Sequence, residues 1–206
     1  MRKKLLLPSI LLSNILLYTA CSQIQPTNMT HTTSNQSAVA TNNHTTPMGN
    51  FSSTSSNGVA HQLTSLQGET ITIIENGNIG FDFPQFQGKI IIFEIFGKDC
   101  EYCLEEAPII NRIKREFSGR VEVVAIQAQG RISPSLASTM LSQQNINYPV
   151  IEGDDAKELL RFLAETYGWT GILPYVLLVK DGITEHTFPD GGVGYEELKE
   201  SIENLL

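Results

Sequence analysis

Two cysteines, Cys100 and Cys103, are separated by two residues, a spacing at which two thiols can form a disulfide that opens and closes reversibly. An apolar run over 90–96 precedes them and is typical of a buried strand, whereas 104–110 has helical periodicity. The pair therefore lies where a strand passes into a helix. A helix N-terminus offers free N–H groups and a partial positive charge, and both stabilise a thiolate.

The order of the two cysteines indicates their roles. Cys100 is nearer the preceding loop and the helix N-terminus, so we expect it to be the nucleophile. Cys103 lies one turn further on, and we expect it to be buried and to resolve a mixed disulfide. A static disulfide or half of a zinc site are the alternatives, but the sequence offers no second cysteine pair or Cys/His pair to complete a zinc site.

Acidic residues surround this pair. Glu94 interrupts the apolar strand, and burial would raise its pKa and allow it to exchange a proton with Cys103. A solvated glutamate at a sheet edge is the alternative. Nearer to Cys100 in sequence, only Lys98 opposes the negative charges of four residues, Asp99, Glu101, Glu105 and Glu106. Their field disfavours a thiolate at Cys100, which predicts a reducing couple.

Composition limits the class of protein. The chain has 206 residues, 41% of them hydrophobic, which suggests one domain with extensions. Its formal net charge of −8 and the lack of a basic stripe argue against nucleic acid as a partner. Three cysteines are too few for a disulfide-stapled scaffold.

The N-terminal residues predict export and anchoring. Residues 1–20 combine three basic residues with a short apolar run and read as a signal peptide. The small residues before Cys21 resemble a bacterial lipobox, which implies that Cys21 carries a lipid; a secreted protein with a free Cys21 is the alternative. Residues 21–58 are rich in Ser, Thr and Asn and predict a disordered tether. In a cell with two membranes, Ser22 in place of the aspartate of inner-membrane retention favours the outer membrane.

The remaining residues, 59–206, predict one α/β domain. A hairpin comes first, residues 81–86 form an aromatic connection, Ser133 caps a helix, and Asp154 caps another that Gly168 ends. We expect three layers, α/β/α, around a mixed sheet. The expected strands are 61–66, 69–74, 89–96, 121–127, 148–151, 175–180 and 183–188, and the expected helices are 103–117, 134–144, 154–167 and 195–205.

This order of elements resembles the thioredoxin fold. The hairpin and the helix-bearing insert around 133–168 resemble the extracytoplasmic TlpA/ResA-like thioredoxins over about 60–206. Glu94 matches the family's buried acid, and Glu106 and Pro108 match its C-x-x-E-x-P pattern. Pro174 matches the cis-proline that faces the disulfide and pairs with a client, although an ordinary proline at a strand start is the alternative.

The sequence departs from the family around the cysteines. Gly97-Lys98-Asp99 replaces the usual tryptophan before the first cysteine, and Tyr102 replaces the usual proline between the two, as in DsbC- and DsbG-like proteins. We expect Glu101, Tyr102 and Leu173 to contact clients, with Tyr102 as an ordinary loop residue in the alternative.

Three hypotheses follow. The first is a membrane-anchored extracytoplasmic thiol–disulfide oxidoreductase that mainly reduces protein clients, with no cofactor or metal beyond Cys100–Cys103. The resemblance implies a membrane electron donor of the CcdA/DsbD type and a role in cytochrome c biogenesis. The second hypothesis is a disulfide oxidase or isomerase, and the third is a non-catalytic chaperone or metallochaperone. A peroxidase is disfavoured because Gly97 stands where peroxiredoxins have Thr or Ser.

Overall fold

Seven consecutive buried residues, Ile90–Phe96, form the strand β4 at the centre of the domain. The computed structural model describes residues 58–206. The predicted signal peptide, Cys21 and nearly all of the predicted tether lie outside these residues. Among the helices of the described part, none is long and apolar enough to cross a membrane.

The central sheet has five strands in the order β6-β5-β4-β7-β8. Strands β5 (Val121–Gln127) and β6 (Val150–Glu152) run parallel to β4, and β7 (Tyr175–Lys180) and β8 (Ile183–Phe188) complete an antiparallel half. The mixed sheet expected from the order of elements is confirmed. Because β4, β5 and β6 are parallel, their carboxyl ends meet at one edge, which carries the loops discussed below.

A second, antiparallel sheet joins β1 (Ala60–Thr64), β2 (Thr70–Asn76) and β3 (Gly80–Asp82). The predicted hairpin is confirmed. The prediction of a connection over 81–86 is partly wrong, because Gly80–Asp82 pairs with β2 and only Pro84–Phe86 forms a short 3-10 turn. A three-residue strand is too short to show a period of two in the sequence.

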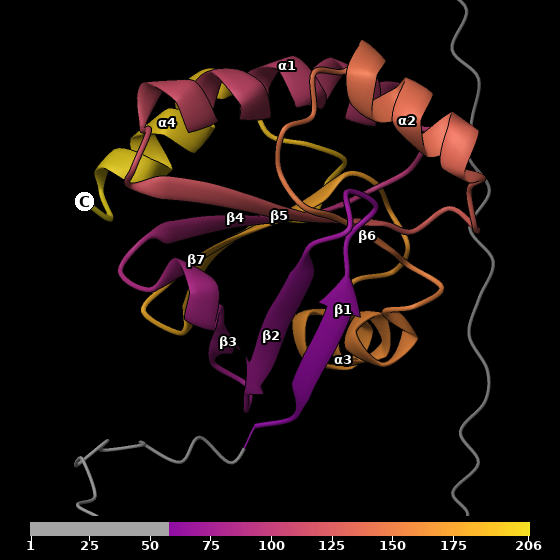
Figure 1. The fold of residues 1–206 in the computed structure, drawn as a ribbon. Coiled ribbons are helices and arrows are strands. Elements are labelled where there is room, and N and C mark those ends of the chain that lie inside the picture. The colour runs from indigo at the N-terminus through magenta and orange to yellow at the C-terminus, as the bar shows by residue number, and fades with distance from the viewer. Residues whose placement is uncertain (1–57) are drawn as a thin grey trace, which may run out of the picture. The chain divides into compact units, whose positions relative to one another are not determined.

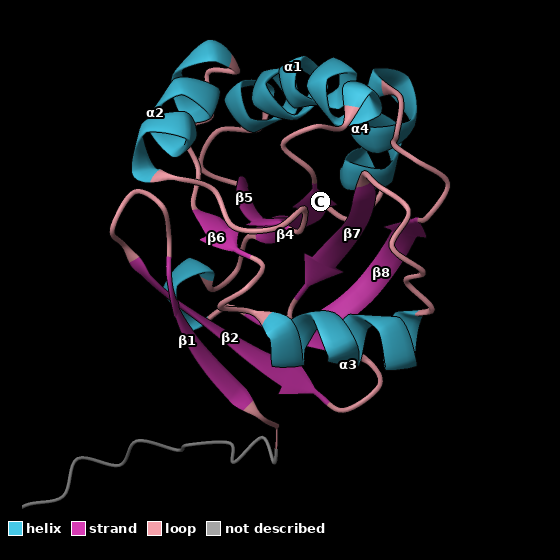
Figure 2. Ribbon diagram, turned by 90° about the vertical axis from the view of Figure 1, so that its right-hand side faces the viewer, coloured by secondary structure: helices cyan, strands magenta, loops and turns pink. Residues whose placement is uncertain are grey.

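Helices cover both faces of the central sheet (Figures 1 and 2). On one face lie α1 (Glu101–Glu116), α2 (Pro134–Gln143) and α4 (Tyr195–Glu203). On the other lie α3 (Lys157–Tyr167) and the small sheet. The expected three layers are therefore present.

Alternation along β4 decides which residues meet α1. Ile90, Ile92 and Phe96 pack in the core that contains both cysteines. Ile91, Phe93 and Ile95 pack in the core that contains Leu159 and Leu163 of α3. Successive side chains of a strand point to opposite faces, so Glu94 belongs to the face of α1 and the cysteines.

Two helix starts differ from the prediction. Helix α1 begins at Glu101, so Cys100 is its N-cap and Cys103 lies inside its first turn. Asp154 does not cap α3, which begins at Lys157 after Ala156 and has no side-chain cap. Instead, the Asp154 carboxylate forms ion pairs with Arg131 and Lys157. Gly168 ends α3 in the left-handed conformation, as predicted (φ 69°).

Candidate active site

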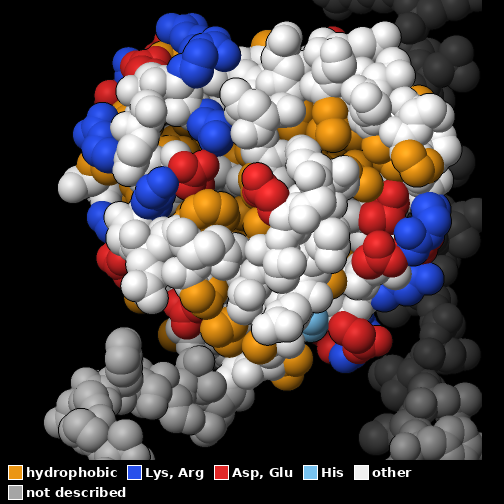
Figure 3. Space-filling model, viewed as in Figure 1, with side chains coloured by type: hydrophobic (Ala, Val, Ile, Leu, Met, Phe, Trp, Pro, Cys, Tyr) orange, Lys and Arg blue, Asp and Glu red, His pale blue; other side chains and the backbone are white. Residues whose placement is uncertain are grey.

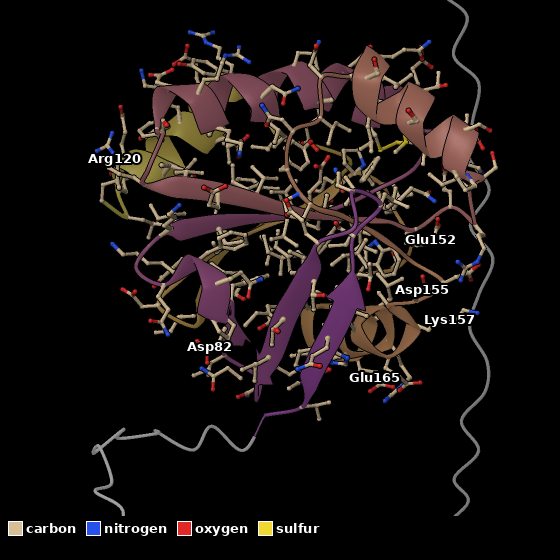
Figure 4. All side chains as sticks on the ribbon, viewed as in Figure 1. Asp82, Arg120, Glu152, Asp155, Lys157 and Glu165 are labelled. Atoms are coloured by element: carbon tan, nitrogen blue, oxygen red, sulfur yellow. A yellow bond between two sulfur atoms is a disulfide. The ribbon has the colours of Figure 1, made fainter. Side chains whose placement is uncertain are left out.

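Cys100 and Cys103 form a disulfide at the N-terminus of α1 (Figure 4). The backbone N–H of Cys103 donates to Sγ of Cys100 at 3.2 Å, the position of an N-cap acceptor. Cys100 is 9% exposed and Cys103 is 2% exposed. The order of accessibility agrees with Cys100 as the attacking sulfur and Cys103 as the resolving one, although both are buried.

Glu94 is buried on the face of the sheet that holds the disulfide. Its sheet neighbours are Ala125 on β5 and Val176 on β7, which offer no polar group from their side chains. Burial, and then the charge of Glu106, raise the pKa of Glu94 to about 8. The sheet-edge alternative is therefore wrong, and Glu94 can hold a proton at neutral pH.

Glu106 is a second buried carboxyl in the same region, one turn after Cys103. Its Oε1 accepts a 2.7 Å hydrogen bond from the backbone N–H of Val193, while Oε2 has no partner among residues 58–206. Burial raises the pKa of Glu106 to about 7, against the opposing effect of the Val193 hydrogen bond. Two carboxyls that repel each other in this way retain at least one proton near neutrality.

Tyr148 is a site residue that the sequence did not single out. Its phenol O–H donates to Oε2 of Glu94 at 3.4 Å, and its ring is buried in the core that holds the cysteines. The residue lies in the loop before β6, where the sequence predicted the start of a strand. Nothing in the spacing or type of this tyrosine could have connected it with Glu94, 54 residues earlier.

The loop before Cys100 is fixed by the loop after β5. Oε1 of Gln129 accepts the Asp99 N–H at 2.8 Å, and its backbone oxygen accepts from Nζ of Lys98 at 2.7 Å. Lys98 also pairs with Asp99 at 2.9 Å. A Cβ placed on Gly97 would lie 2.3 Å from Cδ of Gln129, so a side chain at position 97 would collide with this residue.

Buried polar residues in turn hold Gln129. Oε1 of Gln127 accepts the Gln129 N–H at 2.8 Å, and Nε2 of Gln127 donates to Glu152 at 3.0 Å. Glu152 and Asp155 lie at the carboxyl end of β6 (Figure 4), and Asp155 pairs with Arg131 at 2.6 Å. The sequence alone does not predict this network, because its members come from three separate segments.

The Leu173–Pro174 peptide bond is cis, as the resemblance implied. Pro174 is buried, and an ideal Cβ on Gly192 would lie 3.4 Å from its Cγ and 3.3 Å from Oε1 of Glu106. Gly192 therefore lies against both Pro174 and Glu106. Its φ is 120°, a conformation that favours glycine. Leu173 is half-buried and packs against both cores.

Exposed side chains lie on the first turn of α1 and in the loop before the cis-proline. Tyr102 is 65% exposed, and Glu101, Leu104 and Ile172 are also exposed. On the face shown in Figure 3, acidic and basic side chains are interspersed with apolar ones. The Tyr102 side chain is thus available to a partner protein.

Comparison with known proteins gives matches only among solved structures. No protein-family model and no curated protein matches the chain. A secreted disulfide oxidoreductase from Mycobacterium tuberculosis, homologous to E. coli DsbE, is 18% identical and covers 70% of this chain and 95% of its own, with a TM-score of 0.52. The exposed lipoprotein thioredoxin of Streptococcus pneumoniae is 18% identical over 71% and 99%, with a TM-score of 0.54.

A third match is the thioredoxin domain of a thiol–disulfide oxidoreductase from Bacteroides vulgatus, 16% identical over 70% of this chain and 94% of its own, with a TM-score of 0.52. The described domain has the thioredoxin fold. The resemblance inferred from the residues is confirmed at the level of the fold, together with the hairpin and the insert that carries α2, β6 and α3.

The thioredoxin fold brings together most of the predicted site residues. Cys100 and Cys103 share one core, Glu94 is buried on the face of β4 that packs in this core, and Pro174 and Glu106 both lie against Gly192. Glu101 and Tyr102 are exposed on the first turn of α1. Cys21 lies outside the described residues, and its lipidation remains a prediction.

Proposed function

We propose that this chain is a membrane-anchored extracytoplasmic thiol–disulfide oxidoreductase that mainly reduces disulfides in client proteins. The observation that carries the proposal is the Cys100–Cys103 disulfide at the N-terminus of α1, on the same face of the sheet as the buried acid Glu94. The neighbours described as a secreted disulfide oxidoreductase and an exposed lipoprotein thioredoxin support the chemistry and the extracytoplasmic location. We further propose that a lipid on Cys21 attaches the chain to a membrane, which is the outer membrane in a cell that has two.

The reductive half-reaction uses residues of this chain alone. The Cys100 thiolate attacks one sulfur of a client disulfide, a mixed disulfide forms, and the other client sulfur leaves as a thiolate that takes up a proton. Glu94 in its ionised form accepts the proton of the Cys103 thiol, and the Cys103 thiolate attacks Sγ of Cys100. The second client sulfur leaves Cys100 as a thiolate and takes the proton back from Glu94. The client leaves with two thiols, and Cys100–Cys103 is oxidised by two electrons.

A dithiol must then reduce Cys100–Cys103 again. We propose that a membrane protein of the CcdA/DsbD type supplies these two electrons through its own cysteine pair, and that the disulfide needs no other cofactor. We propose apocytochrome c or its assembly factors as the clients, which would place the chain in cytochrome c biogenesis.

The charges around Cys100 support a reducing couple. Lys98, the basic residue nearest in sequence, is held by Asp99 and by the backbone oxygen of Gln129. Glu101 and Glu105 are exposed on the first turns of α1. Because their charges oppose the helix dipole, we expect the pKa of Cys100 to be nearer to that of thioredoxin, about 7, than to that of the oxidant DsbA, about 3.5.

The second candidate is a disulfide oxidase or isomerase with the same cysteine pair. The exposure of Tyr102 between the cysteines favours it, since an exposed ring offers contact area to a folding client. A non-catalytic chaperone or metallochaperone is a third candidate, and it would need no redox cycling of Cys100 and Cys103.

Redox equilibration decides among these candidates. The full-length protein is titrated in glutathione and dithiothreitol buffers, and a potential near or below about −250 mV identifies a reductase. A potential above about −180 mV, or a Cys100 pKa below about 5, would contradict the reducing direction. A Cys103→Ser variant should accumulate a mixed disulfide with a client, whereas Cys100→Ser should not. If wild type fails to reduce any protein disulfide and Cys103→Ser traps nothing, a non-catalytic role gains support.

A further inference from the structure

Tyr148 provides the hydrogen-bond donor to Glu94. Its phenol O–H lies 3.4 Å from Oε2 of Glu94, and no other donor to this carboxyl is present among residues 58–206. The tyrosine is 3% exposed. Burial and the nearby carboxyls raise the pKa of Tyr148 well above its ordinary value, so the phenol keeps its proton and remains a donor throughout the range in which Glu94 titrates.

Among residues 58–206, no cation forms an ion pair with Glu94 or contributes to its pKa shift. On either side in the sheet lie Ala125 and Val176, and α1 contributes the disulfide and Glu106. No ion pair within residues 58–206 involves Glu94 or Glu106. Tyr148 is therefore the group that favours the charged form of Glu94, against burial and Glu106.

A residue of the hairpin holds Tyr148 in place. Gln67 lies in the turn between β1 and β2, and its Nε2 donates to the backbone oxygen of Tyr148 at 2.7 Å. Its Oε1 accepts the Val150 N–H at 3.1 Å, so one side-chain amide is hydrogen-bonded to the residues before and after Pro149. The turn is itself fixed to β6, because Leu66 N–H donates to the Val150 oxygen at 2.7 Å. The hairpin thus reaches the segment that carries the phenol.

We propose that Tyr148 is a positioning residue that sets the protonation of Glu94, and that Gln67 of the β1–β2 turn holds Tyr148 where it can do so. The inference rests on the proposed function, in which Glu94 exchanges a proton with Cys103. Tyr148 transfers no proton and touches no client in this scheme. It determines the pH at which Glu94 changes from an acid to a base, and the hairpin becomes part of the proton-handling machinery.

The direct test is a carboxyl titration of the oxidised full-length protein. Glutamate side chains are labelled with carbon-13, and the Glu94 signal is assigned by its loss in Glu94→Gln. Removing the phenol O–H in Tyr148→Phe should raise the titration midpoint of Glu94 by about one pH unit, because the charged form loses its donor. Gln67→Ala should raise the midpoint in the same direction and by less.

Two matched controls accompany these variants. Tyr167→Phe removes a phenol that lies in the other core, and Gln62→Ala removes an exposed amide from the same hairpin. Neither should move the Glu94 midpoint. The pH dependence of client reduction gives a second readout, since its Glu94-dependent limb should move to higher pH in Tyr148→Phe and Gln67→Ala alone.

The outcomes separate the parts of the proposal. An unchanged midpoint in Tyr148→Phe overturns it, and a shift in that variant without one in Gln67→Ala removes the role of the hairpin. If Tyr148→Phe does not fold, Gln67→Ala decides, because an unchanged midpoint there would contradict the coupling. A wild-type protein that reduces no client would disprove the proposed function, whereas the titration would still show whether Tyr148 sets the protonation of Glu94.

Discussion

The backbone N–H of Val193 donates to Oε1 of Glu106, while Oε2 of the same carboxyl, buried in α1, has no hydrogen-bond partner within residues 58–206. One carboxyl of α1 is thereby fixed to the loop before α4. An unpartnered carboxylate oxygen in a buried place is costly, which favours the neutral acid. Since Glu106 also raises the pKa of Glu94, the two carboxyls must be tested together.

Glu106→Gln should lower the pKa of Glu94 from about 8 towards its ordinary value. The amide oxygen still accepts the Val193 N–H, but the negative charge that disfavours the Glu94 carboxylate is gone. The Glu94 carboxyl titration measures the effect. Glu105→Gln removes an exposed charge from the next position and should leave the midpoint unchanged; equal shifts in both variants would show that the repulsion is not specific to Glu106.

Glu94→Gln should change how the stability of the oxidised protein depends on pH. The folded-state pKa of about 8 lies above the unfolded value of about 4.5, so the folded wild type binds the extra proton in between. The contribution of Glu94 to the stability is therefore fully present below about pH 4.5 and is lost as the pH rises to about 8.

The variant lacks this loss. The free energy of unfolding of Glu94→Gln should therefore increase relative to that of wild type as the pH rises, by an amount on the order of a few kcal/mol. Urea unfolding at pH 5 and pH 8.5 measures the difference. Parallel curves for the two proteins would mean that Glu94 titrates normally. Client reduction should fall about a hundredfold in the same variant, if Glu94 acts as a general base.

Gly192→Ala should destabilise the domain by about 1–3 kcal/mol. The residue has φ at 120°, and a Cβ would press on both Glu106 and Pro174. Gly194→Ala is the matched control, because its φ is −72° and no heavy atom lies within 4 Å of its ideal Cβ. Thermal or urea unfolding measures both variants, and similar losses in the two would contradict the predicted contact.

Gly97→Ala should destabilise the loop before Cys100, because the new methyl group would collide with the side chain of Gln129. Adding Gln129→Ala removes the obstacle, so the double variant should recover part of the loss. Urea unfolding of the two single variants and the double variant gives the coupling, expected at about 1 kcal/mol or more. Strict additivity would show that the collision is avoided by other movements.

The sequence predicts the chemistry of the cysteines better than their surroundings. Strand β5 has the predicted bounds, Val121–Gln127, because a continuous apolar run between turns is a strong local signal. Strand β3 is stabilised by its pairing with β2, a contact that local pattern does not contain. Asp154 has the residue type of a helix cap, yet its ion pairs with Arg131 and Lys157 prevail.

Site residues, too, could be predicted where the local sequence marks them and not where only the folded chain does. Glu94 could be predicted because a carboxylate stands out within an apolar strand. Tyr148 and Gln67 could not, since a tyrosine in a loop and a glutamine in a turn are ordinary residues until the chain folds. Their roles depend on hydrogen bonds that span 54 and 81 positions along the chain.

Gly58, the first described residue, lies at one end of the domain. Gly58 lies against Glu75, next to Asn76, whose side chain bonds to the β7–β8 turn at Gly182. That turn is at the end of the sheet where β4 begins, whereas Cys100 follows the end of β4 (Figure 1). The chain therefore enters the domain at the pole opposite the disulfide. A large partner can approach Cys100 without meeting Gly58, where the described residues begin.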